Sequence, residues 1–202
     1  MTGIAVLGST GSIGRNTLDV VARHREKYEV VTLTANRDVT GLYQQAMNFR
    51  PRMVAMADQD CARELAGRLA QDAPDIEVLS GVSGLEQAAS HQDAERVMAA
   101  IVGAAGLLPT LAAVRAGKRI LLANKEALVV AGALFMREVR ARQVQVLPID
   151  SEHNAVFQCL PNGLDGDLAG KGVKRILLTA SGGPFRSSSR DELAHVTPEQ
   201  AC

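Results

Sequence analysis

Three equally spaced glycines form the first group of residues whose types could do chemistry. The run GSTGSIG at 8–14 follows a strand-like apolar stretch and opens a helix-like amphipathic one. Gly8 permits a tight exit from the strand, Gly11 lets the backbone approach a diphosphate, and Gly14 lets the helix pack closely on the sheet. The helix start also offers unpaired N–H groups to an anion. The run indicates a dinucleotide site, with a glycine turn that binds nothing as the alternative.

The residues after the second predicted strand bear on the choice of coenzyme. They are Asn36, Arg37 and Asp38. An acid at this place hydrogen-bonds the ribose 2′-hydroxyl of NAD, whereas an arginine accommodates the 2′-phosphate of NADP. Arg37 therefore favours NADPH. Asp38 is either that ribose acid or the N-cap of a helix that begins near Thr40.

A lysine stands where a helix start disfavours it. The run LANKEAL at 122–128 passes from a predicted strand into a predicted helix, at the sheet edge where open α/β folds bind ligands. Asn124 as an N-cap and Glu126 as a first-turn acid are ordinary there. Lys125 opposes the helix dipole by about 0.3–1 kcal/mol. This cost indicates an anionic ligand.

Two carboxylates flank a serine at the end of the last predicted strand. Asp150 and Glu152 stand two residues apart, so in extended backbone their side chains point the same way. Carboxylates suit a hard divalent cation such as Mg²⁺ or Mn²⁺, and water, substrate or a further carboxylate must complete the site. The alternative makes Ser151 an N-cap and Glu152 a first-turn acid. His153 is more often structural than a ligand.

A serine and two glycines follow a later predicted strand, in the run TASGGP at 179–184. Consecutive glycines expose a nest of backbone N–H groups, and Ser181 adds a hydroxyl donor. The run predicts a phosphate cradle or, equally, a plain turn.

The elements that must position these residues alternate along the chain. Strands are predicted over residues 3–7, 28–35, 52–57, 76–79, 96–102, 119–123 and 144–149. Helices are predicted over residues 13–25, 40–49, 61–71, 84–91, 107–116 and 125–143. Near-continuous Val, Ile and Leu in the strands is typical of a parallel sheet covered on both faces. We expect a doubly wound, Rossmann-like α/β domain over residues 1–149.

The pattern changes after residue 150. We predict a helix over 152–160, a loop over 162–172 and a strand over 173–179, which would begin an incomplete α+β catalytic domain over 150–202. Thr197, Pro198 and Glu199 are typical of a helix start. Because so few residues follow, we expect the chain to be a fragment of a longer protein.

Composition excludes several functional classes. The 202 residues carry 22 basic and 22 acidic side chains, and aromatic residues make up 3%. There is no basic footprint and no set of stacking aromatics for nucleic acid. Three separated cysteines favour a reducing cytoplasm over a disulfide framework. The uncharged stretch 97–114 is better explained by a buried strand, a glycine turn and a helix than by a membrane span, and the first ten residues do not resemble a targeting signal.

Taken together and in this order, the runs resemble the 1-deoxy-D-xylulose 5-phosphate reductoisomerase family. The matching segments are GSTGSIG at 8–14, AAIVGAAGLLPTLAA at 99–113, LLANKEAL at 121–128, DSEHNA at 150–155 and SGGPFR at 181–186. The resemblance covers essentially the whole chain. It implies NADPH- and Mg²⁺-, Mn²⁺- or Co²⁺-dependent conversion of 1-deoxy-D-xylulose 5-phosphate to 2-C-methyl-D-erythritol 4-phosphate, in cytoplasmic bacterial homodimers of the non-mevalonate isoprenoid pathway.

The resemblance also implies roles for individual residues. It implies coenzyme contacts for Gly8, Thr10, Gly11, Ser12, Ile13, Asn36, Arg37, Asp38, Asn124 and Glu126. It implies metal binding by Asp150 and Glu152, and substrate contacts for Lys125, Ser151, Glu152 and Ser181, with Lys125, Asp150 and Glu152 as the catalytic set. Many members have Gly-Lys-Asn where this chain has Asn36, Arg37 and Asp38, so the basic centre is kept and the glycine is lost.

Other functions remain as alternatives. A non-catalytic dinucleotide-binding module would bind NADPH equally well after Asp150→Ala and would show no metal-dependent substrate binding. A semialdehyde or homoserine dehydrogenase would not need the paired carboxylates. A short-chain dehydrogenase would need Tyr-x-x-x-Lys, but Thr32 follows Tyr28 and Met47 follows Tyr43 at that spacing. Because the family continues beyond residue 202, we expect this chain to bind NADPH and to have low or no activity.

Overall fold

The computed structural model describes residues 1–161, 168–177 and 183–201. The chain divides into two compact units, Met1–Asp150 and Ser151–Cys202.

The first unit is built on one sheet of seven parallel strands. The strands are β1 (Thr2–Leu7), β2 (Tyr28–Ala35), β3 (Met53–Met56), β4 (Glu77–Ser80), β5 (Arg96–Ala99), β6 (Arg119–Leu122) and β7 (Val146–Pro148). Their order across the sheet is β4-β3-β2-β1-β5-β6-β7. The chain therefore moves outward from β1 to β4 and then returns to β5 on the other side of β1. Ligands of open parallel sheets bind at such a reversal.

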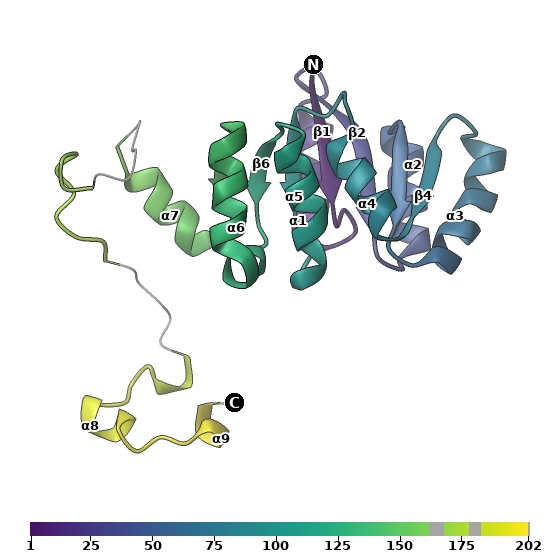
Figure 1. Cartoon of the computed structure of the whole chain (residues 1–202). Helices are drawn as coiled ribbons and strands as arrows, with labels where there is room; N and C mark the ends of the chain where they lie inside the picture. Colours follow the sequence, from purple (N-terminus) through teal and green to yellow (C-terminus); the bar gives the residue numbers. More distant parts are fainter. Residues whose placement is uncertain (162–167, 178–182, 202) are drawn as a thin grey trace. The chain divides into compact units, whose positions relative to one another are not determined.

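Helices cover both faces of the sheet. They are α1 (Ser12–Arg23), α2 (Val39–Phe49), α3 (Gln59–Asp72), α4 (Gly81–Ser90), α5 (Leu107–Arg115) and α6 (Glu126–Arg142). Buried side chains of α1, α2 and α3 share one core cluster, and those of α5 and α6 share another, on the opposite face. Figure 1 shows α4 and α5 in front of the strands. The expected doubly wound α/β fold is confirmed.

Alternate residues of β1 explain this arrangement. Ile4 and Val6 belong to the first core cluster, whereas Ala5 and Leu7 belong to the second. Successive strand residues point to opposite faces of a sheet, so a strand buried on both faces must be apolar at every position. The absence of an apolar–polar alternation in the sequence is the direct result.

The uncharged stretch 97–114 folds as the sequence predicts. It contains the end of β5, a 3-10 turn (η1, Ala104–Gly106) and α5 up to Val114. In the part of the chain that the structure describes, no helix is both long enough and apolar enough to cross a membrane.

The second unit has fewer elements. Its described residues form α7 (Ser151–Cys159), a 3-10 turn (η2, Gly183–Phe185), α8 (Arg190–Leu193) and α9 (Pro198–Ala201). The predicted strand over 173–179 is wrong over 173–177, which form no regular element, and 178–179 lie outside the described residues. The described part of the unit has no strand for it to pair with, and an unpaired strand leaves its backbone groups unsatisfied.

Two glycines should respond in opposite ways to replacement by alanine. A Cβ at Gly14 would lie 2.5 Å from the Cα of Ser9, against backbone that cannot move aside, whereas a Cβ at Gly67 in α3 would meet nothing within 4 Å. We expect Gly14→Ala to lower the free energy of unfolding by about 1–3 kcal/mol, and Gly67→Ala to raise it by about 0.5–1 kcal/mol. Urea unfolding followed by circular dichroism measures both. Equal effects would contradict the close approach at Gly14.

Candidate functional site

The glycine turn lies at the carboxyl end of β1, where the strand order reverses. Gly8 has a φ of +75°, in the left-handed region that favours glycine. A Cβ there would also lie 2.8 Å from the carbonyl oxygen of Ala100, which follows β5. The turn therefore packs closely against the segment that follows β5, the neighbouring strand.

Polar groups of β2 and α2 hold the turn in place. The backbone N–H of Gly8 donates to Thr34 Oγ1 (2.9 Å), and both the N–H and the hydroxyl of Ser9 donate to the Thr34 carbonyl (2.8 and 3.1 Å). Gln45 Nε2 donates to the carbonyl oxygen of Ser9 (2.9 Å). Ser9 is fully buried, so it anchors the turn. This role of Ser9 was not predicted from the sequence, and the available signal was Thr34, a polar residue near the carboxyl end of β2.

The first turn of α1 is open to an anion. Gly11 is its N-cap, no side chain caps it, and the turn contains no acidic residue. Gly11, Ser12 and Ile13 are all exposed. Uncapped N–H groups at a helix start attract negative charge. The local geometry therefore suits a diphosphate, as the sequence predicts.

A small cavity of about 70 Å³ joins the glycine turn to the segments after β5 and β6. Its lining contains three residues predicted for the site, Ile13, Asn124 and Glu126, together with Ala100, Ile101, Val102 and Ala123. The fold brings these predicted residues together from the two halves of the sheet. Their role in binding stays a prediction.

Asn124 forms hydrogen bonds to the segments that line this cavity. Its Nδ2 donates to the carbonyl oxygens of Ile101 and Gly103 (3.0 Å to the second), and its Oδ1 accepts from the N–H of Ala127 (3.1 Å). The residue is 3% exposed. Its side chain therefore bonds the first turn of α6, although the N-cap position itself falls at Lys125, and it also fixes the loop after β5.

Lys125 occupies the N-cap position of α6 and is exposed. In the described part of the chain it forms no ion pair. Glu126 begins the helix beside it. A cation without a protein partner at a helix start is consistent with the predicted contact to an anionic ligand.

The structure after β2 bears on whether Asp38 is the ribose acid or the N-cap of the following helix. Asp38 is the N-cap of α2, and its Oδ1 accepts from the N–H of Gly41 (2.8 Å). Asn36, Arg37 and Asp38 are all exposed. The structure supports the cap interpretation of Asp38.

Arg37 is already paired with a carboxylate. Its Nε lies 3.0 Å from Asp58 Oδ2. The pKa of Asp58 is lowered, chiefly by the hydrogen bond from the N–H of Cys61, with Arg37 contributing. Asp58 therefore stays ionised at neutral pH. A phosphate bound by Arg37 has to share the guanidinium with this acid.

The carboxylates are divided between the two units. Asp150 follows β7 and ends the first unit, at the same sheet edge as the glycine turn, with β5 and β6 between β1 and β7. Ser151 and Glu152 begin α7 in the second unit, so the expectation of extended backbone here is wrong. A helix starts there because serine and an acid suit a first turn.

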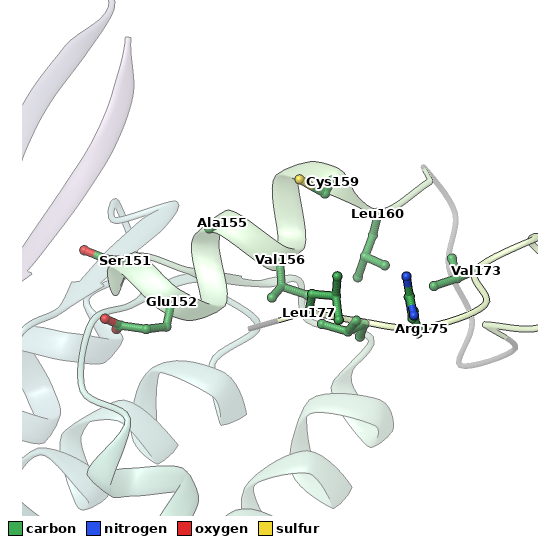
Figure 2. A pocket seen from close by; sticks show the side chains of 10 residues that line it. Ser151, Glu152, Ala155, Val156, Cys159, Leu160, Val173, Arg175 and Leu177 are labelled. Carbon is green, nitrogen blue, oxygen red and sulfur yellow. The ribbon is translucent and has the colours of Figure 1, made fainter. Parts of the chain in front are cut away.

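A cavity of about 410 Å³ lies beside α7 within the second unit. Its lining is Ser151, Glu152, Ala155, Val156, Cys159, Leu160, Val173, Arg175, Ile176 and Leu177. Figure 2 shows the polar ends of Ser151 and Glu152 at the start of the helix and apolar side chains farther along it. Among the described residues, no three His, Cys, Asp or Glu side chains gather as a metal site. Ser181 lies outside the described residues.

These features define a domain of the doubly wound α/β class, with a glycine turn at the reversal of strand order. The comparisons identify the family. Family models of 1-deoxy-D-xylulose 5-phosphate reductoisomerase and of its C-terminal domain match residues 4–132 and 146–202. The chain belongs to the 1-deoxy-D-xylulose 5-phosphate reductoisomerase family.

Individual members of this family are similar to the chain over its whole length. The chain is 59% identical to the reductoisomerase of Nitrosococcus oceani and 58% identical to that of Ralstonia pickettii, in each case over 100% of this chain and 52% and 50% of the relative. It therefore spans about half the length of the curated relatives it matches.

Solved structures show the same similarity. A DOX-P reductoisomerase in complex with NADPH, fosmidomycin and magnesium matches with a TM-score of 0.87 and 41% identity, over 100% of this chain and 50% of that one. The Zymomonas mobilis enzyme in complex with NADPH matches with a TM-score of 0.85 and 45% identity, over 98% and 50%.

Replacing Asn124 tests whether its hydrogen bonds stabilise the segments around the cavity. We expect Asn124→Ala to lower the free energy of unfolding by about 1–3 kcal/mol, because buried backbone groups lose their partners. Asn48→Ala is the control, since Asn48 is exposed and accepts a single side-chain bond, from Arg25. We expect it to change stability by less than about 0.5 kcal/mol. Urea unfolding measures both, and a control that costs as much as Asn124→Ala would refute the assignment.

Proposed function

We propose that this chain carries the NADPH-binding part and the first metal carboxylates of a 1-deoxy-D-xylulose 5-phosphate reductoisomerase. The reaction would convert 1-deoxy-D-xylulose 5-phosphate to 2-C-methyl-D-erythritol 4-phosphate with NADPH and a divalent metal ion. The observation that carries the proposal is the cavity at the strand-order reversal, in a member of this family, which Ile13 shares with Asn124 and Glu126.

The residues present fit NADPH. Thr10, Gly11, Ser12 and Ile13 would hold the diphosphate, since the first turn of α1 offers uncapped N–H groups and no competing acid. Arg37 would contact the 2′-phosphate. The bound coenzyme supplies a hydride. The protein supplies orientation, because the turn is fixed by Thr34 and the opposite wall by Asn124.

The residues present fit a divalent metal in donor chemistry. Asp150 and Glu152 are the residues that would hold Mg²⁺, Mn²⁺ or Co²⁺, since carboxylate oxygens suit hard cations. The bound ion supplies Lewis-acid polarisation of substrate oxygens. Two carboxylates do not complete a coordination sphere, and the described residues contain no group of three.

Other residues would contact the substrate. Lys125 would neutralise negative charge on it, since its ammonium group has no ion-pair partner among the described residues. Ser151 and Glu152, at the start of α7, would supply a hydroxyl and a carboxylate. Ser181 would add a further hydroxyl.

The two predicted domains would divide these tasks, with residues 1–149 binding NADPH and 150–202 contributing metal and substrate residues. Since the relatives are about twice as long, we further propose that this chain alone binds NADPH and turns over little or no substrate. The homodimeric state and cytoplasmic location implied by the family stay predictions. A non-catalytic dinucleotide-binding module is the competing function, because the described residues contain a coenzyme crevice and no assembled metal site.

Calorimetry distinguishes these functions. NADPH is titrated first, and 1-deoxy-D-xylulose 5-phosphate is then titrated with Mn²⁺ into the unaltered chain and Asp150→Ala. We expect the substitution to weaken metal-dependent substrate binding about tenfold or more, equivalent to about 1.4 kcal/mol, and to leave NADPH binding unchanged. Asp75→Ala is the matched control, because Asp75 precedes β4 and so lies at the opposite edge of the sheet. NADPH binding without any metal-dependent substrate binding would favour the non-catalytic module.

A steady-state assay tests the activity of the chain. With saturating substrate, NADPH and Mn²⁺, we expect the loss of NADPH absorbance to be far slower than the roughly 1–10³ turnovers per second common among enzymes. A rate within that range would refute the proposed inactivity, and it would support the reductoisomerase assignment.

A further inference from the structure

A second cavity lies beside the glycine turn. It has a volume of about 460 Å³, and its lining includes Thr10 of the turn, Arg15 of α1, and Asp38 and Thr40 at the start of α2. The helices α1 and α2 precede and follow β2. In doubly wound dinucleotide-binding folds, the adenosine ribose lies at the carboxyl end of this second strand. The cavity is therefore placed where the 2′-phosphate of NADPH would be recognised.

The charges at this place need a further cation. Arg37 is paired with Asp58, so that pair contributes no net charge, and Asp38 adds a carboxylate to the cavity lining. Without another basic group, Arg37, Asp58 and Asp38 together would carry a net negative charge and would repel a phosphate. Arg15 supplies the missing positive charge.

Arg15 is available for a ligand. It is exposed, and it forms no ion pair with any residue that the structure describes. The acid one helical turn further along, Asp19, is engaged by Arg23 at 2.7 Å. An arginine suits this task because its planar guanidinium matches two phosphate oxygens at once.

The remaining lining is mixed, because it includes the aromatic ring of Phe49 as well as several polar side chains. Thr10 and Thr40 are hydroxyl residues, and Gln45 contributes an amide. Gln45 Nε2 is used by the Ser9 carbonyl, whereas Gln45 Oε1 is buried without a hydrogen-bond donor among the described residues.

We propose that Arg15 is a specificity residue that binds the 2′-phosphate of the coenzyme and thereby selects NADPH over NADH. This inference rests on the proposed function, because it presupposes that a nicotinamide dinucleotide binds at the glycine turn. It adds a second basic group to Arg37 and assigns the cavity between α1 and α2 to the phosphorylated ribose.

Titrations of NADPH and NADH, followed by nicotinamide fluorescence, test the inference. Arg15→Gln keeps a side chain of similar helix propensity and removes the charge. We expect it to weaken NADPH binding about tenfold, as for loss of a charge-assisted hydrogen bond, and to change NADH binding less than about twofold. Arg15→Lys should retain most of the NADPH affinity. Arg142→Gln is the control, because it removes an equal charge at the last turn of α6, at the amino edge of the sheet.

The possible results separate this inference from the proposed function. Unchanged NADPH affinity in Arg15→Gln, or parallel weakening of NADPH and NADH, would overturn the role of Arg15 and leave the coenzyme site intact. An equal loss in Arg142→Gln would also overturn it, because the effect would then reflect overall charge. If the unaltered chain binds neither dinucleotide, the proposed function fails and this inference fails with it.

Discussion

The backbone between β1 and α1 passes so close to its neighbours that a hydrogen atom is all that fits at two positions. At Gly8 the obstacle is the carbonyl group of Ala100, and at Gly14 it is the backbone of Ser9. These approaches bring the start of α1 against the segment that leaves β5. The strand order reverses between β1 and β5, and there Ile13 of α1 lines a cavity together with residues that follow β5 and β6. The remaining features of the first unit position ligand groups around this crevice.

Two buried polar residues keep the crevice in shape. Thr34 receives the hydrogen bonds of the turn from β2, and Asn124 holds the loop after β5 and bonds the first turn of α6. The side chain of each residue hydrogen-bonds a segment that is distant in sequence, and burial restricts that side chain to few rotamers. Such satisfied buried groups restrict the loops to one arrangement, since any other would leave a donor or acceptor without a partner. The shape of the crevice thus depends on two buried polar side chains, Thr34 and Asn124.

Charge is distributed around the same edge of the sheet. Lys125 is a cation at a helix start, Arg37 is shared with Asp58, and Asp38 is used as a helix cap. A dinucleotide phosphate and a sugar phosphate both bring negative charge to such an edge, so basic groups without protein partners are the ones best able to respond. Asp150 adds a carboxylate after β7.

The sequence by itself determined the α/β class, the seven strands and six helices of the first unit, and the places where chemistry-bearing residues stand. It could do so because local patterns carry this information: strands buried on both faces are continuously apolar, and Gly8 and Gly14 mark close backbone approaches. Only the tertiary structure decided which residues meet. It brought Ile13 to Asn124 and Glu126, paired Arg37 with Asp58, made Asp38 a cap, and left residues 173–177 without the predicted strand. Pairing of side chains and of strands depends on neighbours supplied by distant parts of the chain, and no local pattern records them.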